Sequence, residues 1–317
     1  MLLKTITELK DVTAGEQICG KYLLYEKVLK KTKDGKDMYN MVLGDTTGMV
    51  DAVAWEGCIF EGDSQVGDIV GIVGKYSLYN DKPQVSITRL KKLDEDKADY
   101  VRSAENRDLL IDKFENMLAN ITDPYLSEVL SRIFTPEVKK EFYNAPGAKK
   151  VHHSYIGGLL EHTVQVANLC INNILTYPNL NEDLLVTGAL LHDVGKIREF
   201  EFDVVSQYTA EGRMMGHIVM GYQMIATIIK NMREEGNDFP PELELMLLNM
   251  ILSHHGLKEH GSPVVPMFPE AMMLHLMDKL DADINVSFNK CNEEGGEGEY
   301  FSSYDNFHGQ YFFKFRY

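Results

Sequence analysis

The larger part of this chain takes its fold from one stretch, Leu184-Leu185-Val186-Thr187-Gly188-Ala189-Leu190-Leu191-His192-Asp193-Val194-Gly195-Lys196. It is almost wholly apolar until a histidine and an aspartate interrupt it. His192 follows Leu185 and Ala189 by seven and three residues, which places all three on one face of a helix. The stretch therefore predicts a helix whose His192-Asp193 pair points toward the protein core.

Other fragments repeat this arrangement of an ionisable group on an apolar helical stripe. They are Glu161-His162, Gly216-His217, His254-His255 and Asp278. His254, for example, follows Leu247 and Ile251 by seven and three residues. The apolar spacing predicts helices over 158–177, 184–194, 216–235, 242–255 and 270–289, and hence an all-α domain.

The inward ionisable groups of these helices indicate a metal centre. A buried ionisable group is costly unless it is paired or bound to a metal. A single inward histidine is usually a satisfied core residue, but several such sites, with an adjacent His-Asp and an adjacent His-His, favour a ligand cluster. Imidazole and carboxylate together suit first-row transition metals. The number of ligands fits two metal ions, an arrangement used to hydrolyse phosphate esters.

The first part of the chain alternates strand and turn signals. Asp34-Gly35 tolerates the positive φ of a tight hairpin turn, and residues 45–48 and 80–83 form later turns. The apolar runs between them predict strands over 18–29, 38–43, 49–55, 69–78 and 84–90. Five short strands of this kind are typical of an OB-fold, a small all-β barrel.

The distribution of charge separates these two parts. Residues 1–93 hold 13 basic and 13 acidic residues, whereas the whole chain of 317 residues has a net charge of −16. All the excess acid therefore lies after residue 93. We expect an OB-fold nucleic-acid-binding domain over 1–93, a linker and leading helices over 94–150, the helical metal domain over 151–290, and a tail of unknown role over 291–317.

The barrel carries candidates for single-strand binding. The pattern of residues 42–48, followed by Val50, Ala52 and Trp55, resembles nucleic-acid-binding OB domains. Stacking aromatics and a basic rim bind single strands on such barrels. The aromatic candidates are Tyr22, Tyr39, Trp55, Tyr76 and Tyr79, and the basic candidates are Lys30, Lys31, Lys33, Lys36 and Lys82. Two alternatives stay open, in which Trp55 belongs to the barrel core and the lysines only solvate a turn.

The composition excludes several classes of protein. No window approaches 18 uninterrupted apolar residues, so a membrane-spanning segment is excluded. The N-terminus has no apolar run typical of a secretory signal. Cys19, Cys58, Cys170 and Cys291 form no CxxC pair, which indicates reduced thiols and a cytoplasmic protein. The sequence leaves a homo-oligomer open.

The ordered set of ligands resembles the HD-domain phosphohydrolases, an all-α superfamily with an H…HD…D signature. His162, His192-Asp193 and Asp278 match that signature. The contexts His152–Thr163, Gly195-Lys196 and His254-His255-Gly256 through Gly261-Ser262-Pro263 look like the YhaM-type 3′–5′ exoribonucleases, which place an OB domain before an HD domain. The resemblance covers about residues 15–290.

This resemblance implies a role for each ligand. His162, His192, Asp193 and Asp278 hold the first metal, Asp193 bridges, and His217, His254 and His255 hold the second. Manganese is the preferred metal, with iron, cobalt or nickel as alternatives.

The resemblance leaves the roles of several other residues open. Lys196 reaches a substrate phosphate or is an ordinary helix-end lysine. His153 contacts substrate, supports the ligands or is structural. Asp281 and Asp283 are expected to support ligands or lie on the surface, and no role is assigned to His260, His275 and His308.

The expected activity is metal-dependent hydrolysis of single-stranded RNA, and also of single-stranded DNA, with release of nucleoside 5′-monophosphates. The 3′ polarity and the preference for RNA come from the resemblance alone. Two alternatives remain: an HD phosphodiesterase or phosphatase for small or cyclic nucleotides, and a non-catalytic single-strand DNA-binding factor with a structural metal.

Overall fold

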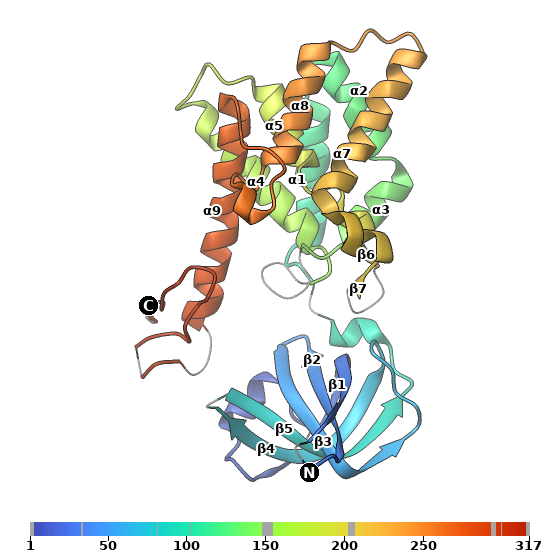
Figure 1. Ribbon diagram of the computed structural model, residues 1–317, viewed down its shortest axis with the longest axis vertical. Helices are drawn as coiled ribbons and strands as arrows, with labels where there is room; N and C mark the ends of the chain where they lie inside the picture. Colours follow the sequence, from blue (N-terminus) through green and yellow to red (C-terminus); the bar gives the residue numbers. More distant parts are fainter. Residues whose placement is uncertain are drawn as a thin grey trace. The chain divides into compact units, whose positions relative to one another are not determined.

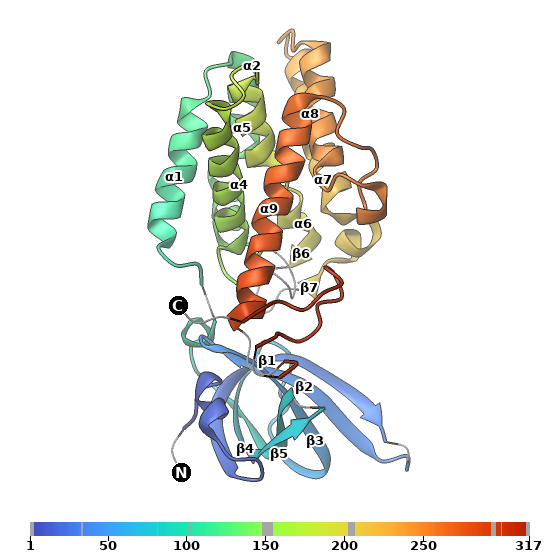
Figure 2. The same cartoon turned by 90° about the vertical axis from the view of Figure 1, so that its left-hand side faces the viewer.

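The computed structural model describes residues 3–32, 34–80, 82–101, 103–147, 155–201, 207–292, 296–298 and 300–314 (Figures 1 and 2). These residues divide into two units: the first holds the described residues up to Ser103 together with 296–298, and the second holds the others from Ala104 onward. The predicted order, an all-β barrel followed by an all-α domain, is confirmed.

The first unit is a closed barrel of five strands, joined in the order β1-β2-β3-β5-β4. The strands are β1 (Gln17–Lys31), β2 (Asp37–Asp45), β3 (Gly48–Glu61), β4 (Ile69–Tyr79) and β5 (Lys82–Leu93), preceded by the short helix η1 (Thr7–Asp11) and followed by η2 (Lys97–Tyr100). Neighbours are antiparallel except β3 and β5, which are parallel. This strand order is the five-stranded Greek-key arrangement of an OB-fold.

The barrel closes because β1 pairs with two different neighbours. Its first half pairs with β4 and its second half with β2, and the register shifts between Leu24 and Glu26 where the strand changes partner. Such bulges bend a strand and increase its twist. A second shift lies at Gly74, where a Cβ would come within 2.5 Å of the Ser86 carbonyl oxygen. Each predicted strand is present, and each extends beyond at least one of its predicted ends.

The second unit is helical. Its helices are α1 (Arg107–Asn120), α2 (Pro124–Ile133), α3 (Pro136–Asn144), α4 (Gly158–Ile174), α5 (Glu182–Leu191), α6 (Lys196–Glu199), α7 (Ala210–Glu234), α8 (Pro241–Ser253), η3 (Lys258–His260) and α9 (Pro269–Asn292). The two-residue strands β6 (Phe200–Glu201) and β7 (Gln207–Tyr208) pair with each other. No helix among the described residues is long and apolar enough to cross a bilayer.

Helix α5 lies at the centre of this unit. Every residue from Leu184 to Leu191 is buried, and α4, α8 and α9 pack against it. A helix that is apolar on all sides is stable only inside a protein. The continuous apolar run that precedes His192 therefore places that residue and Asp193 at the centre of the bundle.

Helix α7 departs from its predicted start at Gly216. It begins six residues earlier, at Ala210, where the Thr209 hydroxyl accepts a hydrogen bond from the amide of Gly212. At Gly216, however, φ is 73° and ψ is 156°, so the helix breaks there. A positive φ of this kind favours glycine. The break starts a new helical segment at His217 and sets the direction of its side chain.

Helices α6 and α7 approach each other closely at Gly195. A Cβ on this residue would lie 2.0 Å from the His217 carbonyl oxygen and 2.6 Å from the Gly221 amide nitrogen. The φ of −62° is ordinary for a helix, so glycine is required here for space and not for its conformation. The close approach fixes the distance between the His192-Asp193 segment and His217.

We expect Gly195→Ala to destabilise the protein by about 1–3 kcal/mol, because the added methyl group overpacks two backbones that cannot both keep their positions. Gly221→Ala is the matched control on the facing helix. Its Cβ would have only ordinary contacts, the nearest at 3.4 Å, and alanine favours the helix over glycine by about 1 kcal/mol. Urea unfolding of both variants measures the difference. Equal stability of the two would contradict the steric account of Gly195.

Candidate metal centre

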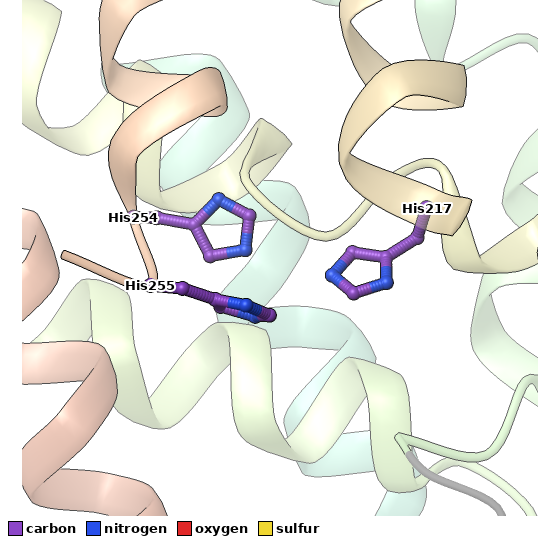
Figure 3. Close-up of side chains that lie close together, drawn as sticks. All are labelled: His217, His254 and His255. Atoms are coloured by element: carbon purple, nitrogen blue, oxygen red, sulfur yellow. The ribbon is translucent and has the colours of Figure 1, made fainter. Parts of the chain in front are cut away.

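The structure brings all seven predicted metal ligands together in one region of the helical unit. Two sets have their ligand atoms within 4.8 Å of one another, namely His162, His192 and Asp193, and His217, His254 and His255. Figure 3 shows the three imidazoles of the second set turned toward a common space. Asp278 on α9 completes the first set, with Oδ1 3.2 Å from His162 Nε2.

Asp193 lies between the two sets and faces each with a different oxygen. Its Oδ2 is 3.5 Å from His162 Nε2 and 3.4 Å from His192 Nε2. Its Oδ1 is 3.4 Å from His217 Nε2 and 3.7 Å from His254 Nε2. One carboxylate therefore faces both ligand sets, which is the arrangement required of a bridging ligand.

Hydrogen bonds to backbone carbonyls determine which nitrogen of three ligand imidazoles is free. His192 and His254 cap the ends of α5 and α8, and each places Nδ1 2.7 Å from the carbonyl oxygen three residues earlier. His255 Nδ1 lies 3.1 Å from the carbonyl oxygen of His260. A carbonyl can only accept, so Nδ1 carries the proton and Nε2 presents a lone pair. All three imidazoles are thus in the form that binds a metal through Nε2.

Carboxylates orient the other two imidazoles. Asp281 Oδ2 lies 2.7 Å from His162 Nδ1, and Glu199 Oε2 lies 3.1 Å from His217 Nδ1. Glu199 also accepts the backbone amide of His217 at 3.2 Å, directly after the break in α7. The sequence assigned Asp281 to a supporting or surface position but missed Glu199. No spacing rule links Glu199 to a histidine 18 residues later.

The charges of the site are those of a ligand cluster. Burial raises the pKa of Asp193, but Lys196 and His192 outweigh it and hold that pKa well below its usual range. Burial likewise opposes ionisation of Asp278, yet hydrogen bonding to His162 lowers its pKa. Both aspartates are therefore ionised, as metal coordination requires.

The histidines divide into two groups by pKa. Burial lowers the pKa of His254, and burial together with the neighbouring His254 and His217 lowers the pKa of His255 to about 3. These two rings stay neutral. Burial also opposes the charged form of His162, but hydrogen bonds to Asp278 and Asp281 raise its pKa to about 10. In the chain alone, this proton offsets part of the charge of the surrounding aspartates.

Unpaired buried atoms show that these residues fit metal ions. Among the described residues, Asp193 Oδ1, His217 Nε2 and His254 Nε2 are buried and have no hydrogen-bond partner. A buried polar atom without a partner costs about 1–3 kcal/mol. All three face the space between Asp193 and the second ligand set. Nitrogen and carboxylate oxygen donors of this kind suit a divalent first-row metal.

Lys196 and a cavity of about 690 Å³ adjoin the cluster. The buried Lys196 places Nζ 2.6 Å from Asp193 Oδ2, so it is not an ordinary solvated helix-end lysine. The cavity is lined by His162, Asp193, Lys196, His254, His255 and Asp278, among others. Its volume is within the range of small-molecule sites.

Several other histidines have partners that the sequence did not reveal. His275 donates from Nδ1 to the carbonyl oxygen of His254 at 2.8 Å and also lines the cavity. His308 contacts Asp305 Oδ1 at 2.9 Å and Asp283 Oδ1 at 3.1 Å. The candidate residues His153 and Lys33 lie outside the described residues.

Some of the predicted stacking residues lie in the barrel core, and others lie at its surface. Tyr22 and Tyr76 are buried in the barrel core, so their prediction as stacking residues is wrong. Trp55 is 48% exposed, so its interpretation as a core residue is also wrong. Tyr39 is half-buried and Tyr79 is 64% exposed. Trp55 and Tyr79 are therefore accessible to a nucleobase.

One of the candidate lysines of the barrel, Lys30, lines a groove of about 280 Å³. Asn40, Tyr79 and Gln84 are among its other lining residues. Lys31 pairs with Asp37 at 2.7 Å and Lys36 with Glu56 at 2.9 Å, both at the surface, and Lys82 is exposed. The sequence missed a further pair, in which Lys27 lies over the rings of Tyr39 and Phe60, 5.3 and 5.5 Å from their centroids.

Known proteins are similar to this chain over most of its length. Residues 159–283 match the HD domain family. The chain is 34% identical over 281 residues to the 3′-5′ exoribonuclease YhaM of Shouchella clausii, covering 86% of this chain and 85% of that protein. It is 31% identical over 293 residues to the protein of the same name in Bacillus subtilis strain 168, covering 90% and 91%. The second OB-fold domain of replication protein A from Methanococcus maripaludis aligns with TM-score 0.25 and 16% identity, covering 30% of this chain and 98% of that one.

We expect Asp281→Asn and Glu199→Gln each to weaken one metal site and spare the other. Each substitution keeps the shape of the side chain but removes the charge that orients one imidazole, His162 or His217. Loss of such a partner typically costs 10- to 100-fold in metal affinity. Manganese titration followed by calorimetry resolves the two sites, and each variant is the control for the other. Equal weakening of both sites in both variants would contradict the division into two ligand sets.

Proposed function

The chain belongs to the family of YhaM 3′–5′ exoribonucleases, and we propose on this basis that it removes nucleoside 5′-monophosphates one at a time from the 3′ end of single-stranded RNA. It is a hydrolase acting on phosphodiester bonds. The relatives extend over both the barrel and the helical unit, because they cover 86–90% of this chain. The similarity therefore concerns both units and not the HD domain alone.

One observation carries the chemistry: Asp193 presents one oxygen to each of two ligand sets. A pair of divalent ions held there would supply a hydrolytic nucleophile at neutral pH and neutralise the charge of a phosphate. The seven side chains would hold these ions, with His162, His192 and Asp278 on one side, His217, His254 and His255 on the other, and Asp193 between them.

Lys196 supplies the positive charge of the protein at this site. Its ammonium group lies 2.6 Å from Asp193 Oδ2 and lines the cavity, so it is within reach of a phosphate bound beside that carboxylate. A lysine binds phosphate as a point charge and stabilises the negative charge that develops during hydrolysis. Lys196 thus binds the scissile phosphate.

Manganese is the metal we propose for this centre, with iron, cobalt and nickel as the alternatives to compare. The donor set of imidazole and carboxylate suits all four. Single-stranded DNA is the second substrate we propose, because a barrel that stacks bases tolerates either sugar. The four cysteines form no disulfide among the described residues, in keeping with action in the cytoplasm.

A 5′-labelled RNA and the matching single-stranded DNA, incubated with the intact chain and manganese, test this function. We expect a ladder that shortens from the 3′ end, with nucleoside 5′-monophosphates as product. Asp193→Asn keeps the size of the side chain but removes the bridging charge, and should slow the ladder by about 1,000-fold or more. Hydrolysis of cyclic or mononucleotides with no ladder from either strand would contradict the proposal and favour a small-nucleotide phosphodiesterase.

We expect the barrel lysines to set the salt dependence of binding to long strands. Replacing Lys30, Lys31, Lys36 and Lys82 by alanine should lower the slope of log affinity against log salt by about 0.7 for each phosphate that is no longer bound. Lys75→Ala with Lys91→Ala is the control, because both residues are exposed on the barrel and neither is among the predicted phosphate contacts. Fluorescence anisotropy with a long labelled RNA at several salt concentrations gives the slopes. The same slope in the fourfold variant, the control and the unaltered chain would exclude these four lysines as contacts to the strand.

A further inference from the structure

Residues 300–314 form a segment for which neither the metal chemistry nor the barrel supplies a role. We call it the aromatic tail, because seven of its fifteen residues are phenylalanine or tyrosine. It folds back on itself, with bridges between Phe301 and Phe313 and between Asp305 and Gln310. It belongs to the helical unit and lies beside the end of α9 (Figures 1 and 2). Its rings remain largely exposed.

Polar contacts attach the aromatic tail to α9. His308 Nε2 lies 3.1 Å from Asp283 Oδ1, and Lys290 donates to the Ser303 hydroxyl at 2.8 Å. Within the tail, the same His308 contacts Asp305 through both its amide and its ring. Asp283 is five residues after the metal ligand Asp278 on one continuous helix. The tail is therefore held at a fixed distance from the metal centre.

This attachment places Phe307 at the cavity that adjoins the metal centre. Phe307 and Asp305 line that cavity together with the metal ligands, although Phe307 is 73% exposed. The ring of His260, which follows α8 and also lines the cavity, lies 6.4 Å from the Phe307 ring, with 40° between their planes. Two rings from separate elements thus lie near each other in the lining of the cavity, and both are open to solvent.

The cavity extends along helix α9 away from the metal ligands. Asp278, Ala282 and Val286 all line it and lie four residues apart on that helix, so they share one face. Its lining combines charged groups, among them the metal ligands and Lys196, with the apolar side chains of Ala282, Val286 and Phe307. A nucleotide has the same combination, with a charged phosphate and a flat, largely apolar base.

We propose that Phe307, with His260 beside it, forms a stacking site for the nucleobase of the 3′-terminal nucleotide, the one that is removed. This inference rests on the proposed exonuclease function and names the part of the substrate that the aromatic tail binds. Every base has a π-face, so a stacking site of this kind accepts all four. An enzyme that shortens a strand without regard to sequence needs such tolerance at the residue it releases.

Single-turnover hydrolysis tests the site with two RNAs that differ only in whether the 3′-terminal nucleotide carries a base. We expect Phe307→Ala to lose about 10- to 100-fold in rate at subsaturating enzyme on the normal end, as removal of a stacking ring does. The abasic end should be slow with the unaltered chain and no slower with Phe307→Ala. Phe307→Trp should keep the rate, and His260→Ala should lose less than Phe307→Ala.

Phe288→Ala is the matched control, since Phe288 is a 62%-exposed ring on α9 that does not line the cavity. A second measurement does not depend on turnover. A 3′-terminal 2-aminopurine, joined by a phosphorothioate that resists hydrolysis, should lose fluorescence on stacking with the unaltered chain and with Phe288→Ala, but not with Phe307→Ala.

The two measurements separate failure of this site from failure of the proposed function. RNA left intact by the unaltered chain would contradict the exonuclease function, and the fluorescence loss would still decide whether Phe307 binds the base. Phe307→Ala that matches the unaltered chain in rate on the normal end and in fluorescence would overturn the stacking site. Rates that fall equally on the normal and abasic ends would overturn it as well, because they would show a structural effect of the tail.

Discussion

The helical unit depends on an ionised carboxylate at its centre. Asp193 is almost fully buried, and Lys196, 2.6 Å from its Oδ2, compensates for part of the lost hydration. Metal ions held by the surrounding imidazoles would compensate for the rest. These imidazoles come from different helices and helix ends. A shift of one of these helices would therefore leave the Asp193 carboxylate buried without compensation. The positions of the ligands are thus also required for the core to pack.

Helix packing fixes the positions of the elements around Asp193. Helix α5 is buried on all sides and carries His192 to the centre, while α4, α8 and α9 lie against it. The break at Gly216 turns His217 toward Asp193, and the close approach of Gly195 to the His217 backbone sets their separation. These features explain how two ligand sets can share one carboxylate without a long connecting loop.

The sequence predicted the parts of the molecule that follow a regular period. His192 and His254 were found because they continue an apolar helical stripe, and the barrel was found because its strands alternate between turns. What it missed depends on contacts between distant segments. Glu199 orients the His217 ring only because the break in α7 turns His217 toward it. Tyr22 is buried because it lies on the inward face of β1 with Ile18 and Gly20, where its hydroxyl donates to the carbonyl oxygen of Lys4 at 2.7 Å.

The caps on α5 and α8 have a thermodynamic consequence. The last carbonyl groups of a helix lack partners within the helix, and His192 and His254 satisfy one of them in each case. The two rings are therefore ordered by the folding of their own helices, with the correct nitrogen exposed, before any ion arrives. Little rotamer entropy remains to be lost when the ion binds, so affinity at this centre is gained largely by preorganisation. In a flexible chelator the metal itself must order the ligand groups, whereas here the helix ends have already ordered them.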